Sequence, residues 1–231
     1  MRNFWLAVVL TVVFCGPVWA GETKGVDLTS LEARQGYSIG YQLGLDFKSK
    51  NIAIDTGAMT AGIKAAMEGT EPGLAKDEMR TVLSDIQKKV EAERAEKYKK
   101  ASEENKMEGE KFLKENAAKE GVTTLPSGLQ YKVLKMGDGP KPTATSKVTV
   151  NYSGTLPDGT EFDSSYKRGQ PVTFQVNKVV PGWTEALQLM PEGSKWQLVL
   201  PAALGYGERG APPRIGPNQV LVFEVELLKV E

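Results

Sequence analysis

The fold is decided by residues 148–165, which read VTVNYSGTLPDGTEFDSS. In the first half, Val148, Val150 and Tyr152 share one face, and the residues between them are polar. This period of two predicts a β-strand with one buried side. The second half contains Pro-Asp-Gly at 157–159, where proline fixes φ and glycine permits a positive φ, so a tight turn follows the strand. Together they predict part of an antiparallel sheet.

The segment 122–231 continues in the same way. Strand-like runs separated by Gly- and Pro-rich turns are predicted at Gln130–Lys135, Val148–Thr155, Val172–Val176, Trp196–Pro201 and Val220–Val230. One helical pattern lies among them, carried by Trp183, Ala186, Leu187 and Met190. Strands wrapped on a single helix predict an α+β domain. The alternation directs four aromatic side chains toward one interior volume: Tyr152, Trp183, Trp196 and Phe223.

The preceding segment, residues 76–120, predicts one long connecting helix. Its apolar stripe from Met79 to Val90 thins further on, where lysine, arginine and glutamate alternate at helical spacing. Such a helix is expected to be solvated nearly all round and to act as a spacer of about 65 Å. Gly109 is its one weak point, costing about 1 kcal/mol against alanine. We expect Gly121 to end it.

Residues 27–75 predict a helical dimerisation unit. Thr29 with Glu32 three residues later forms a capping box for the first helix, and Asp55 and Gly69 are expected to bound the second. Glycines at 36, 40 and 44 lie on one side of the first helix, where a second backbone could approach closely. That backbone belongs either to a second copy or to the next helix of the same chain. Two short helices bury little core alone, which favours a dimer.

The N-terminal residues 1–20 predict a secretory signal peptide. A positive start precedes an apolar run that is too short for a stable membrane anchor, and Ala20 precedes the expected cleavage point. The alternative is a lipoprotein with Cys15 as the lipidated residue, although Phe14 is bulky where a small residue is expected. The expected location is the periplasm, the outer membrane surface or the exterior.

Composition excludes several kinds of chemistry. The chain has no histidine, and its one cysteine, Cys15, falls in the predicted signal peptide. We therefore expect no disulfide, no thiolate nucleophile, no Ser-His catalysis and no Cys- or His-bound zinc in the mature protein. Lys plus Arg equals Asp plus Glu at 29 each, so no overall field attracts nucleic acid. Any activity is expected to need no metal and no cofactor.

Five ordered motifs in the last 82 residues add specific information. They are Val150-Asn-Tyr-Ser-Gly154, Gly159-Thr-Glu-Phe-Asp-Ser-Ser165, Val179-Val-Pro-Gly-Trp183, Leu204-Gly-Tyr-Gly207 and Leu221-Val-Phe-Glu-Val-Glu-Leu-Leu228. In this order and spacing they strongly resemble an FKBP-type peptidyl-prolyl cis-trans isomerase. With Tyr37-Ser-Ile-Gly40 and Pro126-Ser-Gly-Leu-Gln-Tyr131 included, residues 27–231 are similar to the macrophage infectivity potentiator (Mip) branch of secreted bacterial FKBPs.

The resemblance implies a twisted antiparallel sheet curled around one short helix, with an apolar pocket between them. Three matched residues are expected to be catalytic: Tyr152, Asp163 and Tyr206. Eight others are expected to bind substrate: Phe162, Arg168, Phe174, Val179, Val180, Trp183, Ile215 and Phe223. Val172 stands where many relatives carry an aromatic residue, and Ala211 replaces a histidine of some eukaryotic relatives.

Some of these residues also have structural interpretations. Trp183 fits a core position as well as a pocket floor. Asp163 could order its own turn, or it could accept hydrogen bonds from Tyr152 and Arg168, since a buried carboxylate requires partners. Tyr206 lies in a glycine-flanked loop, where aromatic residues more often serve binding than packing. The resemblance favours the functional interpretation of all three.

The sequence therefore predicts a peptidyl-prolyl isomerase that acts on X–Pro bonds of envelope or secreted proteins, with chaperone activity as a dimer. The resemblance implies a homodimer through the N-terminal helices, proline-containing peptides and unfolded proteins as partners, and inhibition by rapamycin-type macrolides. Two alternatives use the same pocket for binding alone: a non-catalytic periplasmic chaperone and a surface interaction protein.

Overall fold

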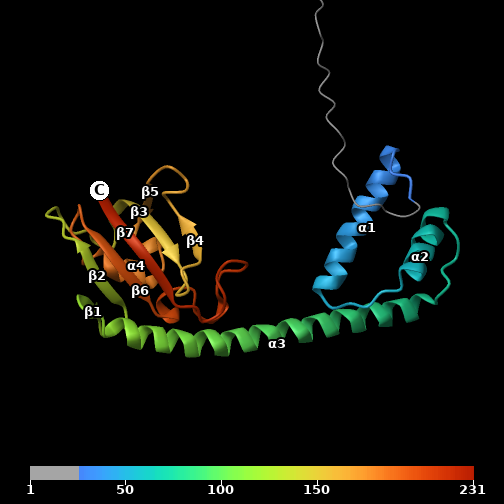
Figure 1. The fold of residues 1–231 in the computed structure, drawn as a ribbon, viewed down its shortest axis with the longest axis horizontal. Helices are drawn as coiled ribbons and strands as arrows, with labels where there is room; N and C mark the ends of the chain where they lie inside the picture. Colours follow the sequence, from blue (N-terminus) through green and yellow to red (C-terminus); the bar gives the residue numbers. More distant parts are fainter. Residues whose placement is uncertain (1–25) are drawn as a thin grey trace, which may run out of the picture. The chain divides into compact units, whose positions relative to one another are not determined.

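The computed structural model describes residues 26–231 (Figure 1). The predicted signal peptide of residues 1–20, with Cys15, lies outside the described residues. From Gln87 to Glu231 the chain forms one compact unit, which the described N-terminal helices do not share. The sheet and most of the long helix thus belong to one unit, and the division between a connecting helix of residues 76–120 and a domain of residues 122–231 stays a prediction.

The first helix begins at a different cap from the predicted one. Helix α1 (Leu31–Ser49) has Ser30 as its N-cap, and the Ser30 hydroxyl accepts a hydrogen bond from the Ala33 amide at 3.1 Å. Thr29 as N-cap is therefore wrong. The Asp27 carboxylate already accepts from the Thr29 amide at 2.9 Å, and the next hydroxyl, on Ser30, stands at the helix start.

The second helix, α2 (Thr56–Glu68), begins and ends where the sequence predicts. The Asp55 carboxylate accepts from the Ala58 amide at 2.8 Å, and Gly69 ends the helix in the left-handed conformation at φ +69°. Neither α1 nor α2 contains a fully buried residue.

The three glycines of α1 lie open in the single chain. Gly36, Gly40 and Gly44 line a groove of about 490 Å³ together with residues of α2. A Cβ atom built on any of the three would meet nothing within 4 Å. Helix α2 therefore does not make the close backbone approach that the four-residue spacing allows.

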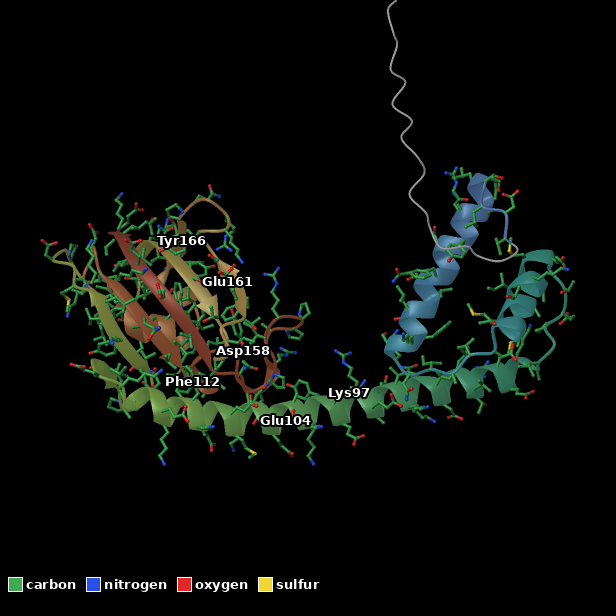
Figure 2. The ribbon with its side chains drawn as sticks, in the orientation of Figure 1. Lys97, Glu104, Phe112, Asp158, Glu161 and Tyr166 are labelled. Atoms are coloured by element: carbon green, nitrogen blue, oxygen red, sulfur yellow. The ribbon has the colours of Figure 1, made fainter. Side chains whose placement is uncertain are left out.

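Helix α3 (Lys76–Ala117) is a single run of 42 residues and ends three residues before the predicted limit. Every residue from 91 to 100 is exposed except Glu93, which is half-buried, as expected for a solvated spacer. The expectation of solvent all round is wrong further on, because Gly109 and Asn116 are buried. The C-terminal half of α3 runs along the sheet, with Phe112 and Asp158 between the helix and the sheet (Figures 1 and 2).

The C-terminal part is a curled antiparallel sheet in the order β1-β2-β6-β7-β3-β4, with β5 also paired to β3. The strands are β1 (Val122–Thr124), β2 (Gln130–Lys135), β3 (Lys147–Thr155), β4 (Glu161–Ser164), β5 (Val172–Gln175), β6 (Lys195–Leu200) and β7 (Leu221–Val230). Five of these strands agree with the prediction to within one residue at each end. β1 and β4 were not predicted, because runs of three and four residues are too short to show a period.

One short helix, α4 (Pro181–Leu187), packs in the curl of the sheet (Figure 1). Three single 3₁₀ turns complete the unit: η1 (Val176–Lys178), η2 (Ala202–Leu204) and η3 (Gly207–Arg209). The predicted inward face of β7 is buried, with Leu221, Val225 and Leu227 fully enclosed. The family-implied fold, a twisted antiparallel sheet around one helix, is confirmed.

Packing between α3 and the sheet reverses the usual effect of a Gly→Ala substitution at Gly109. In an isolated helix alanine would add about 1 kcal/mol of stability. Here a Cβ would lie 2.8 Å from Cγ2 of Val220, a buried and stiff side chain. We expect Gly109→Ala to destabilise the protein by about 1–3 kcal/mol.

Thermal unfolding monitored by tryptophan fluorescence measures this effect, since Trp183 and Trp196 are the only tryptophans after residue 20. The second substitution Val220→Ala in the same chain should recover most of the stability lost by Gly109→Ala. A single Gly109→Ala variant that unfolds at a higher temperature than wild type would contradict the packing.

Candidate active site

A cavity of about 510 Å³ opens between α4, the sheet and the loop before β7. Its lining is mainly aromatic, aliphatic and proline side chains: Tyr152, Phe162, Asp163, Phe174, Lys178, Val179, Val180, Trp183, Tyr206, Ala211, Pro212, Pro213, Arg214, Ile215 and Phe223. Every predicted site residue except Arg168 lies in this lining. An apolar cavity with a few polar groups is the usual form of a small-ligand or peptide site.

Trp183 is the central contact of the cavity. It lies in the first turn of α4, which begins at Pro181, a residue whose fixed φ suits a helix start. The indole ring meets three other rings edge to face: Tyr152 at 5.2 Å, Phe223 at 5.3 Å and Phe174 at 5.9 Å between centroids. Trp183 is only 4% exposed, so its ring is fixed on all sides except the cavity.

The remaining aromatic wall is built in the same way. Phe162 on β4 meets Phe223 on β7 edge to face, at 5.5 Å between ring centroids. Gly154 of β3 makes the approach possible, since a Cβ there would lie 2.7 Å from the Phe162 ring and 2.8 Å from that of Phe223. Strand β4, which the sequence did not predict, thus positions one wall of the cavity.

One corner of the cavity carries three polar side chains in mutual contact. The Tyr152 hydroxyl donates to Asp163 Oδ2 at 2.5 Å and accepts from Arg168 Nη2 at 2.7 Å. Arg168 Nη1 forms an ion pair with Asp163 Oδ1. The Ser164 amide also donates to Oδ1, at 2.9 Å, so the carboxylate both orders its turn and fixes the Tyr152 ring. Arg168 therefore lies outside the cavity lining but holds two residues of it.

These contacts keep Asp163 ionised. Burial, the largest single influence, raises the pKa of Asp163, but hydrogen bonds from Tyr152 and Arg168, with the charge of Arg168, outweigh it and lower the pKa overall. The pKa of Tyr152 is raised, first by burial and then by its hydrogen bond to Asp163. Near neutral pH the corner thus holds a carboxylate, a guanidinium and a protonated phenol.

Tyr206 lies on the opposite side, in the loop between β6 and β7. Its side chain is 42% exposed, and its hydroxyl has no hydrogen-bond partner among residues 26–231. The same loop supplies Ile215, which is bound to Ala211 by a pair of backbone hydrogen bonds of 2.9 and 3.1 Å. The free hydroxyl is available to a ligand in the cavity.

Several lining residues were missed by the sequence analysis: Lys178, Pro212, Pro213 and Arg214. Arg214 Nη1 donates to the Phe162 carbonyl at 2.8 Å, and Arg214 also lines a second hollow of about 600 Å³ beside the cavity. The Pro-Pro pair in a glycine-rich loop was the one available signal. Val172, which stands where many relatives carry an aromatic residue, does not reach the cavity lining.

Residues 26–231 contain no cluster of three or more acidic, histidine or cysteine side chains that could hold a metal ion. None of the helices in this range is both long and apolar enough to span a membrane.

Comparisons with known proteins agree with this geometry. A family described as "FKBP-type peptidyl-prolyl cis-trans isomerase" matches residues 139–228. A second, described as "Domain amino terminal to FKBP-type peptidyl-prolyl isomerase", matches residues 32–133. The two matches together span nearly all of the described chain, including the helices and the cavity.

Individual relatives match over most of their length. "Outer membrane protein MIP" of Legionella longbeachae is 46% identical, over 90% of this chain and 90% of that protein. The FKBP-type 22 kDa peptidyl-prolyl cis-trans isomerase of Escherichia coli (strain K12) is 45% identical, over 87% of this chain and 96% of that one. The crystal structure of FkpA from Escherichia coli superposes with a TM-score of 0.68 at 35% identity, over 88% and 98% of the two chains. With a cavity built as the motifs require, such similarity establishes that this protein is a member of the FKBP-type peptidyl-prolyl cis-trans isomerases.

Proposed function

We propose that this isomerase accelerates cis-trans interconversion of X–Pro bonds in proteins of the bacterial cell envelope, and that it does so as a homodimer. The observation that carries the catalytic part is the apolar cavity over Trp183, which has a free hydroxyl on Tyr206 and a neutralised carboxylate at its corner. Rotation about an X–Pro bond needs no nucleophile.

The barrier to rotation about an X–Pro bond is about 18–20 kcal/mol, because rotation destroys amide resonance. The planar amide has more charge separation than the twisted one, so removal from water destabilises the planar form more. A hydrogen-bond donor placed for the twisted geometry adds binding that exists only near the transition state. An apolar cavity with one free donor supplies both effects.

The residues take the following roles in this proposal. Trp183 forms the floor under the proline ring, and Phe162, Val179 and Phe223 form the walls. The Tyr206 hydroxyl donates to the substrate carbonyl. Asp163 acts through Tyr152, whose ring it fixes with Arg168, and the remaining wall residues close the cavity: Phe174, Val180 and Ile215.

The homodimer would form through the open glycine face of α1. Its support is the absence of any fully buried residue in α1 and α2, combined with two large apolar side chains of the groove that are left exposed, Ile54 and Ile63. A second copy seated on the groove would cover these two side chains and bring two backbones together over Gly36, Gly40 and Gly44. Two pockets on one dimer would also raise the effective concentration of the second site for an unfolded client, which supports chaperone activity.

The envelope location rests on the predicted signal peptide and on one relative whose name is "Outer membrane protein MIP". The clients in this proposal are proline-containing segments of unfolded secreted or envelope proteins. Rapamycin-type macrolides are proposed to compete for the same cavity.

The catalytic roles predict how single substitutions divide between activity and stability. Tyr206→Phe and Asp163→Ala should lower kcat/KM at least tenfold with small changes in melting temperature, since each removes polar contacts and leaves the apolar core in place. Trp183→Ala should impair both, because truncating a large buried aromatic residue costs about 3–5 kcal/mol. Peptide isomerisation coupled to proteolysis, with and without rapamycin, gives the rates.

Two results would count against these roles. A wild-type protein that gives no acceleration over the thermal rate at micromolar concentration would favour the binding-only alternatives. Equal losses of melting temperature in all three variants, in proportion to their losses of rate, would mean that the residues are structural.

The dimer proposal predicts that Gly40→Leu shifts the protein toward monomer, because a large side chain prevents close approach of two helices at this face. Gln42→Leu adds the same side chain elsewhere on α1, outside the groove, and serves as the matched control. Light scattering gives the mass of each. A Gly40→Leu protein with the mass of a dimer would move the contact to another surface.

The ionised corner predicts a pH dependence of stability. The pKa of Asp163 is lower in the folded protein than in the unfolded chain, so its contribution is complete above about pH 4 and is lost as the pH falls through the folded pKa. The difference in melting temperature between wild type and Asp163→Asn should therefore be constant from pH 5 to pH 8 and shrink at lower pH. A difference that grows as the pH falls would have the wrong sign for this ion pair.

A further inference from the structure

The half-buried face of α3 carries polar side chains at helical spacing. Tyr98, Ser102 and Asn105 follow one another at intervals of four and three residues, and the buried Gly109 continues the series. Such intervals place side chains on one side of a helix. This polar face therefore meets a single segment of the neighbouring structure.

The segment it meets is the loop between β6 and β7, residues 205–220. Asn105 Nδ2 donates to the Pro217 carbonyl at 2.7 Å, and Asn218 Nδ2 donates to Ser102 Oγ at 2.7 Å. The Tyr98 hydroxyl donates to the carbonyl of Glu208. About two turns of α3 thus hold this loop at three points through hydrogen bonds.

The same loop forms one wall of the active-site cavity. Tyr206 precedes Glu208 by two residues, and Ile215 precedes Pro217 by two, and both line the cavity. The Asn218 amide donates to the Gly207 carbonyl at 2.9 Å, which links the Ser102 contact directly to the residue after Tyr206. The loop is therefore held by α3 on one side and faces the substrate cavity on the other.

The path of this loop allows the contact. Gly216 has no side chain beside Asn105, and a Cβ there would lie 2.9 Å from Asn105 Nδ2. Asn218 takes a positive φ of 53°, which turns the chain back before β7. The segment from Pro201 to Val220 contains only the 3₁₀ turns η2 and η3 and one isolated β-bridge. Its position therefore depends on individual hydrogen bonds such as those from α3.

We propose that Ser102 and Asn105 of α3 are positioning residues for catalysis: they hold the Tyr206–Ile215 wall of the cavity in the geometry that binds the twisted X–Pro bond. This inference rests on the proposed roles of Tyr206 and Ile215. The long helix is then a component of the active site as well as a connector, although none of its residues touches the substrate.

The alternative is that these contacts only dock α3 on the sheet, and the chain offers a matched control for that case. Asn116 Nδ2 donates to Gln130 Oε1 at 2.8 Å, and Gln130 Nε2 donates to the Leu113 carbonyl at 2.9 Å. This second contact joins the same helix to β2 and involves no residue of the cavity lining. It docks the helix without holding the catalytic loop.

The test compares full-length variants in the peptide isomerisation assay. Ser102→Ala with Asn105→Ala should lower kcat/KM about three- to tenfold, as expected when two hydrogen bonds of ordinary strength no longer order the wall. The loss should appear mainly as a lowered kcat, because the wall is held for the twisted geometry, which exists only near the transition state. Ser102→Thr keeps the accepting hydroxyl and should retain wild-type kcat/KM.

Asn116→Ala makes the same chemical change as Asn105→Ala at the docking contact. It should lower the melting temperature, measured by tryptophan fluorescence, and leave kcat/KM of the folded protein unchanged. Hydrogen exchange of residues 205–219 should accelerate in Ser102→Ala/Asn105→Ala and stay at the wild-type rate in Asn116→Ala.

The outcomes distinguish failure of the positioning role from failure of the proposed function. Unchanged kcat/KM in Ser102→Ala/Asn105→Ala, or an equal loss in Asn116→Ala, overturns the positioning role while wild-type catalysis stands. A Ser102→Thr variant as impaired as Ser102→Ala/Asn105→Ala likewise overturns it, since loss of the hydroxyl would not be the cause. Loss of activity by Tyr206→Phe with no effect of the α3 variants leaves the proposed function intact and removes only this inference.

Discussion

The isomerase unit depends on the contacts of one indole ring. Trp183 comes from the single helix inside the sheet, and its edge-to-face contacts reach β3, β5 and the last strand, β7. The ring therefore joins elements that are far apart in the sequence, and its upper surface becomes the floor of the cavity. Core packing and the cavity floor are two sides of the same side chain, and a floor of this kind requires neither a histidine nor a thiol.

Around this floor the polar groups are few and each is held by a different part of the structure. Tyr152 is fixed by Asp163 and Arg168 from β4 and the turn after it. Tyr206 belongs to a loop whose outer side is bound by α3. The floor and the charged corner are thus held by contacts within the domain, and the wall that contains Tyr206 is held by hydrogen bonds from α3. In this account the helix connects the N-terminal unit to the cavity as well as to the sheet.

The sequence predicted the elements that have a clear period and missed those that depend on tertiary contact. Alternation located β3, β6 and β7, and the family resemblance located ten of the fifteen residues that line the cavity. Strands β1 and β4 were too short to show a pattern. The face of α3 that meets the loop was hidden because serine, asparagine and glycine within a charged helix look solvated until Val220 and Pro217 are placed against them. Arg214 was missed for the same reason, since its partner is a backbone carbonyl.

The central claim is that the cavity lowers the barrier to X–Pro rotation and does not merely bind proline. Magnetisation exchange between the cis and trans signals of a short X–Pro peptide tests this most directly, because uncatalysed exchange takes tens to hundreds of seconds. With substoichiometric protein we predict exchange within the time of the NMR measurement, and its loss when Tyr206 is replaced by phenylalanine. Shifted peptide signals that show binding, with cis and trans forms still exchanging at the thermal rate, would contradict the account.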